Sequence, residues 1–282
     1  MKKFITLLLS FCMLITEIPI SVLADSTPEI PLEEFADKLS DMQEKYEDEP
    51  VSNRLIVKSK YDINELDSVD IVEGYDDLHI LQFDNSVSVE KALEYYENNN
   101  RVEYAEADMT VSTLEAGSVH YDNHLSWGSE TIGVDDYIDY LDNISDLPEI
   151  VIGVIDTGVD TDHEFLQGRV IETGFNLSDT GVTDSEEDDN GHGTHVAGII
   201  ADNTTDNVKI KAFKCLNANG SGSLFDVCLA VEAAAEQNVN VINMSLGSKG
   251  KSLLLEEYIE NAISNGITVC VAAGNNGDYA SN

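Results

Sequence analysis

Apolar positions in the second half of the chain alternate between short continuous runs and segments with helical spacing. Four runs predict strands that are buried on both faces: 151–155, 208–213, 239–244 and 267–272. The spacing of apolar residues between them predicts three helices: 192–201, 224–237 and 253–264. Strands that alternate with helices are typical of the α/β class. The pattern therefore predicts a parallel sheet covered by helices.

The first half of the chain shows a different pattern. Residues 55–57, 79–83 and 102–106 read as strands, and residues 89–98 have helical spacing. This combination predicts a small α+β unit over 51–112. An acidic linker is expected at 25–50, and residues 113–127 read as a connector because they show no firm periodicity.

The amino terminus has the pattern of a secretory signal peptide over residues 1–24. Lys2 and Lys3 precede an apolar run, and small residues end at Ala24, where cleavage is expected. An uncleaved anchor is the alternative, although the run is short for a membrane span. The pattern predicts a secreted protein with no membrane span after the signal is removed.

The net charge of −39 changes the picture of possible partners. Binding to nucleic acid requires Lys and Arg to replace the counterions of the phosphates, so this class of partner is excluded. Acidic residues cluster at 184–189, where a cation could bind, but a solvated acidic loop is the stronger interpretation.

Cys215 and Cys270 lie in apolar runs, which predicts buried thiols rather than a disulfide framework.

Asp156 and His192 are the strongest candidates for chemistry. Asp156 ends an apolar strand, where a carboxylate can hold an imidazole and stabilise its charged form. A turn-capping role is the alternative, since Asp-Thr-Gly is also typical of turns. His192 lies between two glycines at the start of a predicted helix, where it could accept a hydroxyl proton. Pairing of His192 with His195 in a metal site is disfavoured, because Gly193 stands where zinc proteases carry Glu.

A third candidate follows the last predicted strand. Asn275 lies in Ala-Ala-Gly-Asn-Asn-Gly at 272–277, where its amide could donate to a developing oxyanion. A plain Asn-Gly turn is the alternative. Asp156, residues 243–247 and residues 272–275 each follow the carboxyl end of a strand, and that edge is where open α/β sheets form their sites.

Together these segments resemble the subtilisin-like serine proteases. Gly-His-Gly-Thr-His-Val-Ala-Gly at 191–198 is a long match, and the order Asp, His, Asn is that of the family. The resemblance implies a Ser/His/Asp endopeptidase that acts on polypeptides, with Asp156 and His192 in the triad and Asn275 as oxyanion donor. It implies substrate-binding residues in three segments: Ser245, Leu246, Gly247; Gly220, Ser221, Gly222; and Ala272, Ala273, Gly274.

The resemblance also predicts the domain organisation. Residues 51–115 are similar to an inhibitory propeptide that acts on its own protease in cis, and residues 116–282 correspond to the amino-terminal part of a catalytic domain. The maturation cut is expected between Leu114 and Trp127. No metal ligand is assigned and no cofactor is expected with certainty, although calcium is considered.

One departure from the family concerns the nucleophile. The family carries it in a Gly-Thr-Ser segment well after the oxyanion Asn, and only seven residues follow Asn275 here. We therefore expect a chain truncated within its catalytic domain and inactive as it stands. The alternative function is a non-catalytic module that binds peptides or inhibits a protease.

Overall fold

The computed structural model describes residues 53–61, 63, 69–72, 77–83, 87–113, 127–141, 143–171, 175–177 and 187–274. These residues all belong to one compact unit, Leu32–Asn282. The predicted signal peptide, the acidic linker, residues 114–126 and Asn275 lie outside the described residues.

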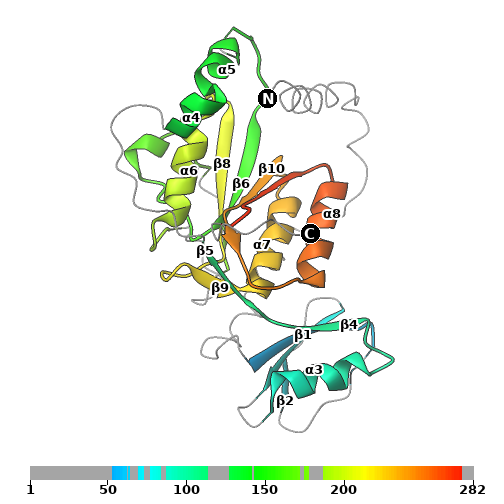
Figure 1. Ribbon diagram of the computed structural model, residues 1–282. Coiled ribbons are helices and arrows are strands. Elements are labelled where there is room, and N and C mark those ends of the chain that lie inside the picture. Colours follow the sequence, from blue (N-terminus) through cyan, green and yellow to red (C-terminus); the bar gives the residue numbers. More distant parts are fainter. Residues whose placement is uncertain are drawn as a thin grey trace. The chain divides into compact units, whose positions relative to one another are not determined.

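A five-stranded parallel sheet organises residues 150–271 (Figure 1). Its strand order is β12-β10-β6-β8-β7. The strands are β6 (Ile150–Asp156), β7 (Phe175–Asn176), β8 (Val208–Lys214), β10 (Val241–Met244) and β12 (Thr268–Val271). β6 lies at the centre, with Val154 opposite Ala212 of β8 and Asn243 of β10. The predicted parallel α/β sheet is confirmed.

The crossover helices are α6 (His192–Asp202), α7 (Leu224–Glu236) and α8 (Leu253–Ser264). The step from β6 to β8 runs in one direction across the sheet, and the steps to β10 and β12 run in the other. Since such crossovers are right-handed, α6 covers one face and α7 and α8 cover the other. Val154, Ile210 and Ala212 of the sheet pack with Ala197 of α6 in one buried cluster.

The helix starts follow from local sequence. Ser223 caps α7 by accepting a hydrogen bond from the Asp226 amide at 3.0 Å, and Ser252 caps α8 through the Leu255 amide at 2.9 Å. α6 has no side-chain cap; the residue before it is Gly191, whose φ of 100° is readily adopted only by glycine. Each start lies after a strand, so the helix amino termini gather near the carboxyl edge of the sheet.

The first half of the described chain forms an antiparallel sheet of order β2-β3-β1-β4 with one helix. Its elements are β1 (Arg54–Lys58), β2 (Val69–Val72), β3 (Leu78–Phe83), α3 (Val89–Glu97) and β4 (Tyr104–Ala107). Leu55, Val57, Leu81 and Phe83 pack with Tyr96 of α3 in a second buried core. The predicted α+β unit is therefore present, although β4 begins two residues later than expected and β2 was not predicted.

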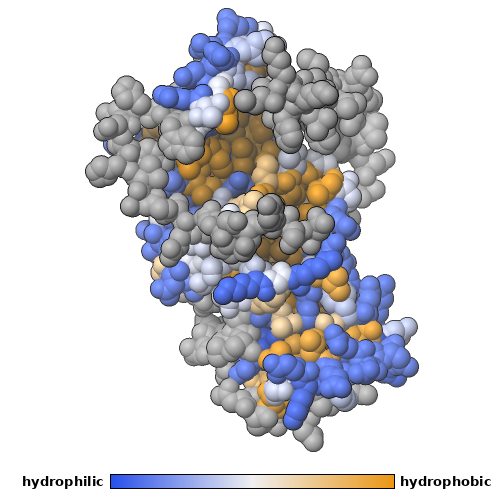
Figure 2. Space-filling view, in the orientation of Figure 1, coloured by the Kyte–Doolittle hydropathy of each residue, from blue (hydrophilic) through white to orange (hydrophobic). Residues whose placement is uncertain are grey.

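A third, three-stranded sheet links the two halves. β5 (Thr110–Thr113) lies between β9 (Ser221–Ser223) and β11 (Leu246–Gly247) and is antiparallel to both. Two further helices, α4 (Trp127–Ile132) and α5 (Val134–Leu141), and the short 3₁₀ turn η4 (Glu164–Leu166) complete the described elements. The apolar pattern predicted neither α4 nor α5. In Figure 2 apolar side chains gather in a hollow over the parallel sheet, whereas hydrophilic residues cover α5.

The two cysteines of the apolar runs differ in burial. Cys215 is buried, as expected, and its burial raises the pKa of the thiol. Cys270 is exposed, so the prediction of a buried thiol was wrong there. The physical reason is position, because among the described strands β12 pairs only with β10 and lies at the edge of the sheet.

Candidate active site

Asp156 is the last residue of β6 and is fully buried. Its Oδ1 accepts a hydrogen bond from the Thr157 amide at 2.7 Å and lies 2.7 Å from Nδ1 of His192. An ionised carboxylate can only accept, so the imidazole donates through Nδ1. This arrangement leaves Nε2 as the imidazole nitrogen that can exchange a proton with a substrate or a nucleophile.

His192 is held at the first position of α6. Gly193, the next residue, is buried against the segment that follows β6. A Cβ at position 193 would overlap the carbonyl oxygen of Gly158 and lie 3.2 Å from Cβ of Asp156. Only glycine therefore lets the helix start approach the end of β6 closely enough for the Asp156–His192 hydrogen bond. The His192 side chain keeps an exposed fraction of 15%.

Lys214 is a functional candidate that the sequence reasoning missed. It ends β8 in register with Asp156, and its side chain is buried with an exposed fraction of 4%. Nζ donates to the Thr157 carbonyl at 2.6 Å, to Oδ1 of Asp189 at 2.6 Å and to the Leu216 carbonyl at 3.0 Å. A buried ammonium with three acceptors ties three loops together at the carboxyl edge. The signal in the sequence was a cation at the end of an apolar strand.

Asp188 was predicted only as part of an acidic cluster. Burial by itself would raise the pKa of this carboxyl, but hydrogen bonds from Gly191, Thr194 and Thr157 outweigh it and lower the pKa below its usual value. Asp188 is therefore an ionised acceptor at neutral pH. It belongs to the structure around His192 rather than to a solvated loop.

The predicted substrate-binding segment at 220–222 is paired with the chain itself. Val111 lies opposite Gly222, and Ser112 lies opposite both Ser221 of β9 and Gly247 of β11. The Thr113 amide donates to the Gly220 carbonyl at 2.8 Å. Val111 is 1% exposed. Two of the three predicted segments thus flank residues 110–113, which occupy the position between β9 and β11 (hereafter the groove).

Other predicted residues are less closely engaged. Ser245 lies between β10 and β11, and its Oγ accepts a hydrogen bond from Nδ2 of Asn243 at 3.1 Å. Residues 272–274 follow β12 and are exposed, with the Ala272 amide donating to the Met244 carbonyl at 3.1 Å. This bond places the third segment beside β10. The oxyanion role of Asn275 remains a prediction.

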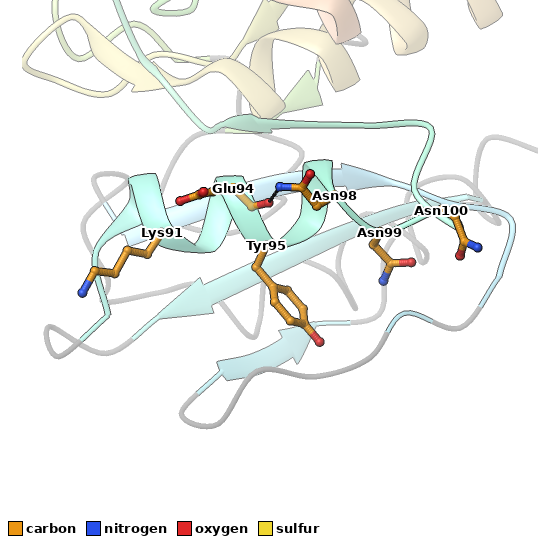
Figure 3. Close-up of a pocket in the computed structure, with 6 residues that line it drawn as sticks. All are labelled: Lys91, Glu94, Tyr95, Asn98, Asn99 and Asn100. Carbon is orange, nitrogen blue, oxygen red and sulfur yellow. Dashed lines mark hydrogen bonds between the residues drawn. The ribbon is translucent and has the colours of Figure 1, made fainter.

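A separate hollow of about 670 Å³ lies on the small α+β unit. Figure 3 shows its lining, Lys91, Glu94, Tyr95, Asn98, Asn99 and Asn100, on and just after α3. Nδ2 of Asn98 donates to the Glu94 carbonyl at 2.6 Å, which closes the helix end. The hollow contains none of the predicted site residues.

The part of the chain that the structure describes shows neither a metal-binding cluster nor a membrane-spanning helix. There, no three His, Cys, Asp or Glu side chains are grouped so as to hold a metal ion. Among the same residues, no helix is both long enough and apolar enough to span a bilayer. Calcium remains only an expectation.

Known proteins give the arrangement a context. Residues 148–282 match the sequence profile of the subtilase family. The chain is 36% identical over 209 residues to the "Thermophilic serine proteinase" of Bacillus sp. (strain AK1), covering 71% of this chain and 50% of that protein. It is 34% identical to the "Minor extracellular protease Epr" of Bacillus subtilis (strain 168), covering 65% of this chain and 28% of that protein.

Among solved structures, fervidolysin from Fervidobacterium pennivorans, described as a keratinolytic enzyme related to subtilisin, shares the fold. The TM-score is 0.60 at 21% identity, over 79% of this chain and 40% of that chain. The chain spans about half the length of the curated relatives that it matches first.

Proposed function

Residues 148–282 belong to the subtilase family of serine proteases, and we propose from this that the chain is part of the precursor of a secreted, subtilisin-like endopeptidase. The observation that carries the proposal is the 2.7 Å hydrogen bond between His192 and buried Asp156. Such a pair takes a proton from a nucleophile and returns it to the leaving amine of a peptide bond.

In this proposal each group has a defined role. Nε2 of His192 is the general base, Asp156 fixes the tautomer and stabilises the imidazolium, and Asn275 donates to the oxyanion. The substrate lies extended between β9 and β11 and pairs with both as an added strand. No Gly-Thr-Ser segment occurs in the 282 residues. We therefore expect these residues alone to form no acyl-enzyme.

The docking of the small unit supports precursor status. Two carboxylates at the end of β4 meet the starts of two helices: Glu106, within β4, accepts from the Leu253 amide at 2.8 Å, and Asp108, just after it, accepts from the Phe225 amide at 3.2 Å. Anionic groups at helix amino termini are favourable, since unpaired amides and the helix dipole lie there. Residues 53–113 thus hold α7 and α8 while β5 fills the groove, as an inhibitory propeptide acting in cis would.

Two further contacts join the same surfaces. Lys58 of β1 forms an ion pair with Glu257 of α8, and the Tyr104 hydroxyl donates to the same carboxylate at 3.3 Å.

Secretion is part of the proposal because residues 1–24 have the pattern of a signal peptide.

A serine-directed fluorophosphonate tests the function. The longest polypeptide that the gene encodes should be labelled on a serine of a Gly-Thr-Ser segment once the propeptide is removed, and His192→Ala should abolish labelling. The 282 residues expressed alone should stay unlabelled. Labelling that survives His192→Ala, or labelling of the 282-residue chain, would contradict the proposed mechanism.

The filled groove also favours a second candidate, a protease-inhibiting module. In that case the 282-residue chain should inhibit an active subtilase saturably, with residues 53–113 providing the contacts. If inhibition is unchanged when the Glu106 and Asp108 carboxylates are replaced by amides, the module does not act through this docking surface.

A further inference from the structure

Asp188 accepts hydrogen bonds from both segments that carry the Asp156–His192 pair. Oδ1 accepts from Oγ1 of Thr157 at 2.8 Å and from the amides of Asn190 at 3.0 Å and Gly191 at 2.8 Å. Oδ2 accepts from the amide of Thr194 at 2.9 Å and from its Oγ1 at 2.7 Å. These five donors come from the residue after Asp156 and from the residues around the start of α6. One carboxylate therefore connects the two halves of the pair.

Thr157 transmits this connection. Its amide donates to Oδ1 of Asp156, the oxygen that also meets His192. Its hydroxyl donates to Asp188 and accepts from the Gly193 amide at 2.9 Å. A hydroxyl has a single proton, and a carboxylate only accepts, so Asp188 fixes the direction of both bonds. The Gly193 amide, which is buried, then has an acceptor.

The negative charge is required by the geometry. Each of the five hydrogen bonds described for the Asp188 side chain comes from a donor directed at one of its two oxygens. An amide in its place would keep one accepting oxygen but would turn an NH₂ group toward the Thr194 amide. That would leave two buried or half-buried donors facing each other, which costs more than the loss of one hydrogen bond. Asn is therefore not a conservative replacement at this position.

We propose that Asp188 is a positioning residue for the candidate catalytic pair, holding the end of β6 and the start of α6 at the separation that the Asp156–His192 hydrogen bond requires. The proposal rests on the proposed function, because it concerns the same pair. It assigns no contact with substrate to Asp188, which acts through Thr157 and Thr194.

A purely structural role would stabilise the loop without affecting His192, and the two roles can be separated by NMR. The Nδ1 proton of an imidazole hydrogen-bonded to a buried carboxylate gives a resolved low-field resonance. Its exchange with water reports the integrity of that one bond. The 282-residue chain is measured as wild type, Asp188→Asn, Thr157→Val and Thr157→Ser, with Glu187→Gln as a matched control that neutralises an adjacent exposed carboxylate.

The resonance is expected in the wild type, in Thr157→Ser, which keeps the hydroxyl, and in Glu187→Gln. In Asp188→Asn and Thr157→Val the Nδ1 proton should exchange at least about tenfold faster, because the bond opens more often. Backbone resonances of α7 and β8 show whether each variant is folded. If Asp188→Asn does not fold, the Thr157→Val and Thr157→Ser pair decides the matter.

Two results would count against the proposal, and they differ in meaning. A resonance that is present in the wild type and exchanges at an unchanged rate in both Asp188→Asn and Thr157→Val would overturn the positioning role alone. A resonance absent from the wild type, and equally absent from Asp156→Asn, would show that the pair does not form. That outcome would overturn the proposed function together with the role of Asp188.

Discussion

Replacing Gly193 with alanine tests whether the close approach of α6 to β6 creates the Asp156–His192 pair. The added Cβ would overlap the Gly158 carbonyl oxygen, well inside the 3.0 Å that real Cβ atoms keep. The neighbour is backbone of the segment that follows β6, so it cannot rotate away as a side chain could. The helix start and the loop must separate by roughly 1 Å, the scale at which catalytic geometry is lost. Such a separation would stretch the 2.7 Å Asp156–His192 bond beyond hydrogen-bonding distance.

Gly198 provides the matched control, because it lies in the same helix and a Cβ there meets no atom within 4 Å. Gly198→Ala should stabilise the chain by about 0.5–1 kcal/mol, since alanine restricts the unfolded chain and favours helix. Gly193→Ala should destabilise it by roughly 1–3 kcal/mol through overpacking. The two variants receive the same chemical change in one helix, so their difference isolates the contact with Gly158.

Urea unfolding followed by circular dichroism gives the free energy of unfolding of both variants, and proton NMR gives the state of the His192 Nδ1–H. We expect opposite shifts of the urea midpoint and loss of the low-field resonance only in Gly193→Ala. Equal stability of the two variants, with the resonance intact in both, would refute the argument that glycine is required at this contact.

The remaining predictions concern residues 106–113. Burial raises the pKa of Asp108 to about 6, with the Arg54 guanidinium and helix amides partly offsetting the rise. A folded-state pKa above the unfolded value of about 3.9 means that the stabilisation is complete below pH 3.9 and lost as pH rises through 6. From pH 4 to pH 7 the free energy of unfolding of the wild type should therefore fall by about 2 kcal/mol relative to that of Asp108→Asn. Urea midpoints measured across this range give the two pH profiles, and parallel profiles would contradict the prediction. Thr113→Pro removes the amide that donates to Gly220, which should weaken β5 by about 0.5–1.5 kcal/mol and speed proteolytic cutting within 110–113. Thr113→Val keeps the amide and should be cut at the wild-type rate; equal rates for Pro and Val would show that this bond does not hold β5.

Most of the parallel sheet could be predicted from the sequence, because each buried strand and each covering helix has its own periodicity. Residues 192–201, for example, carry helical spacing and glycines at the start, and α6 begins at His192 as expected. The predicted start of β4 was two residues too early, because the apolar residues there gave no sharp signal for where the strand begins. Helix α4 was missed because its six residues are too few to show a helical period, and α5 was missed because its acidic residues leave a narrow apolar stripe.

The site was predictable only in part. Asp156 and His192 stand in a specific motif, but Asp188 and Lys214 act through partners that are distant in sequence, such as Thr157. Such contacts depend on how loops meet at the sheet edge, which no local pattern encodes. The pairing of β5 with β9 and β11 likewise consists of backbone hydrogen bonds between short polar segments, and these carry no apolar signature.

The position of β5 between β9 and β11 has a kinetic consequence. In the proposed function, residues 110–113 are joined covalently to the groove that they fill, so they compete with any free peptide as a tethered ligand. Tethers of this kind give effective concentrations of order millimolar, far above the level of most peptides in solution. A peptide that binds the groove weakly is therefore excluded by mass action alone, and access depends on how fast β5 leaves. Cutting the chain after residue 113 would end the tether without altering a single contact of β5, and would turn a permanent occupant into one that can be diluted away.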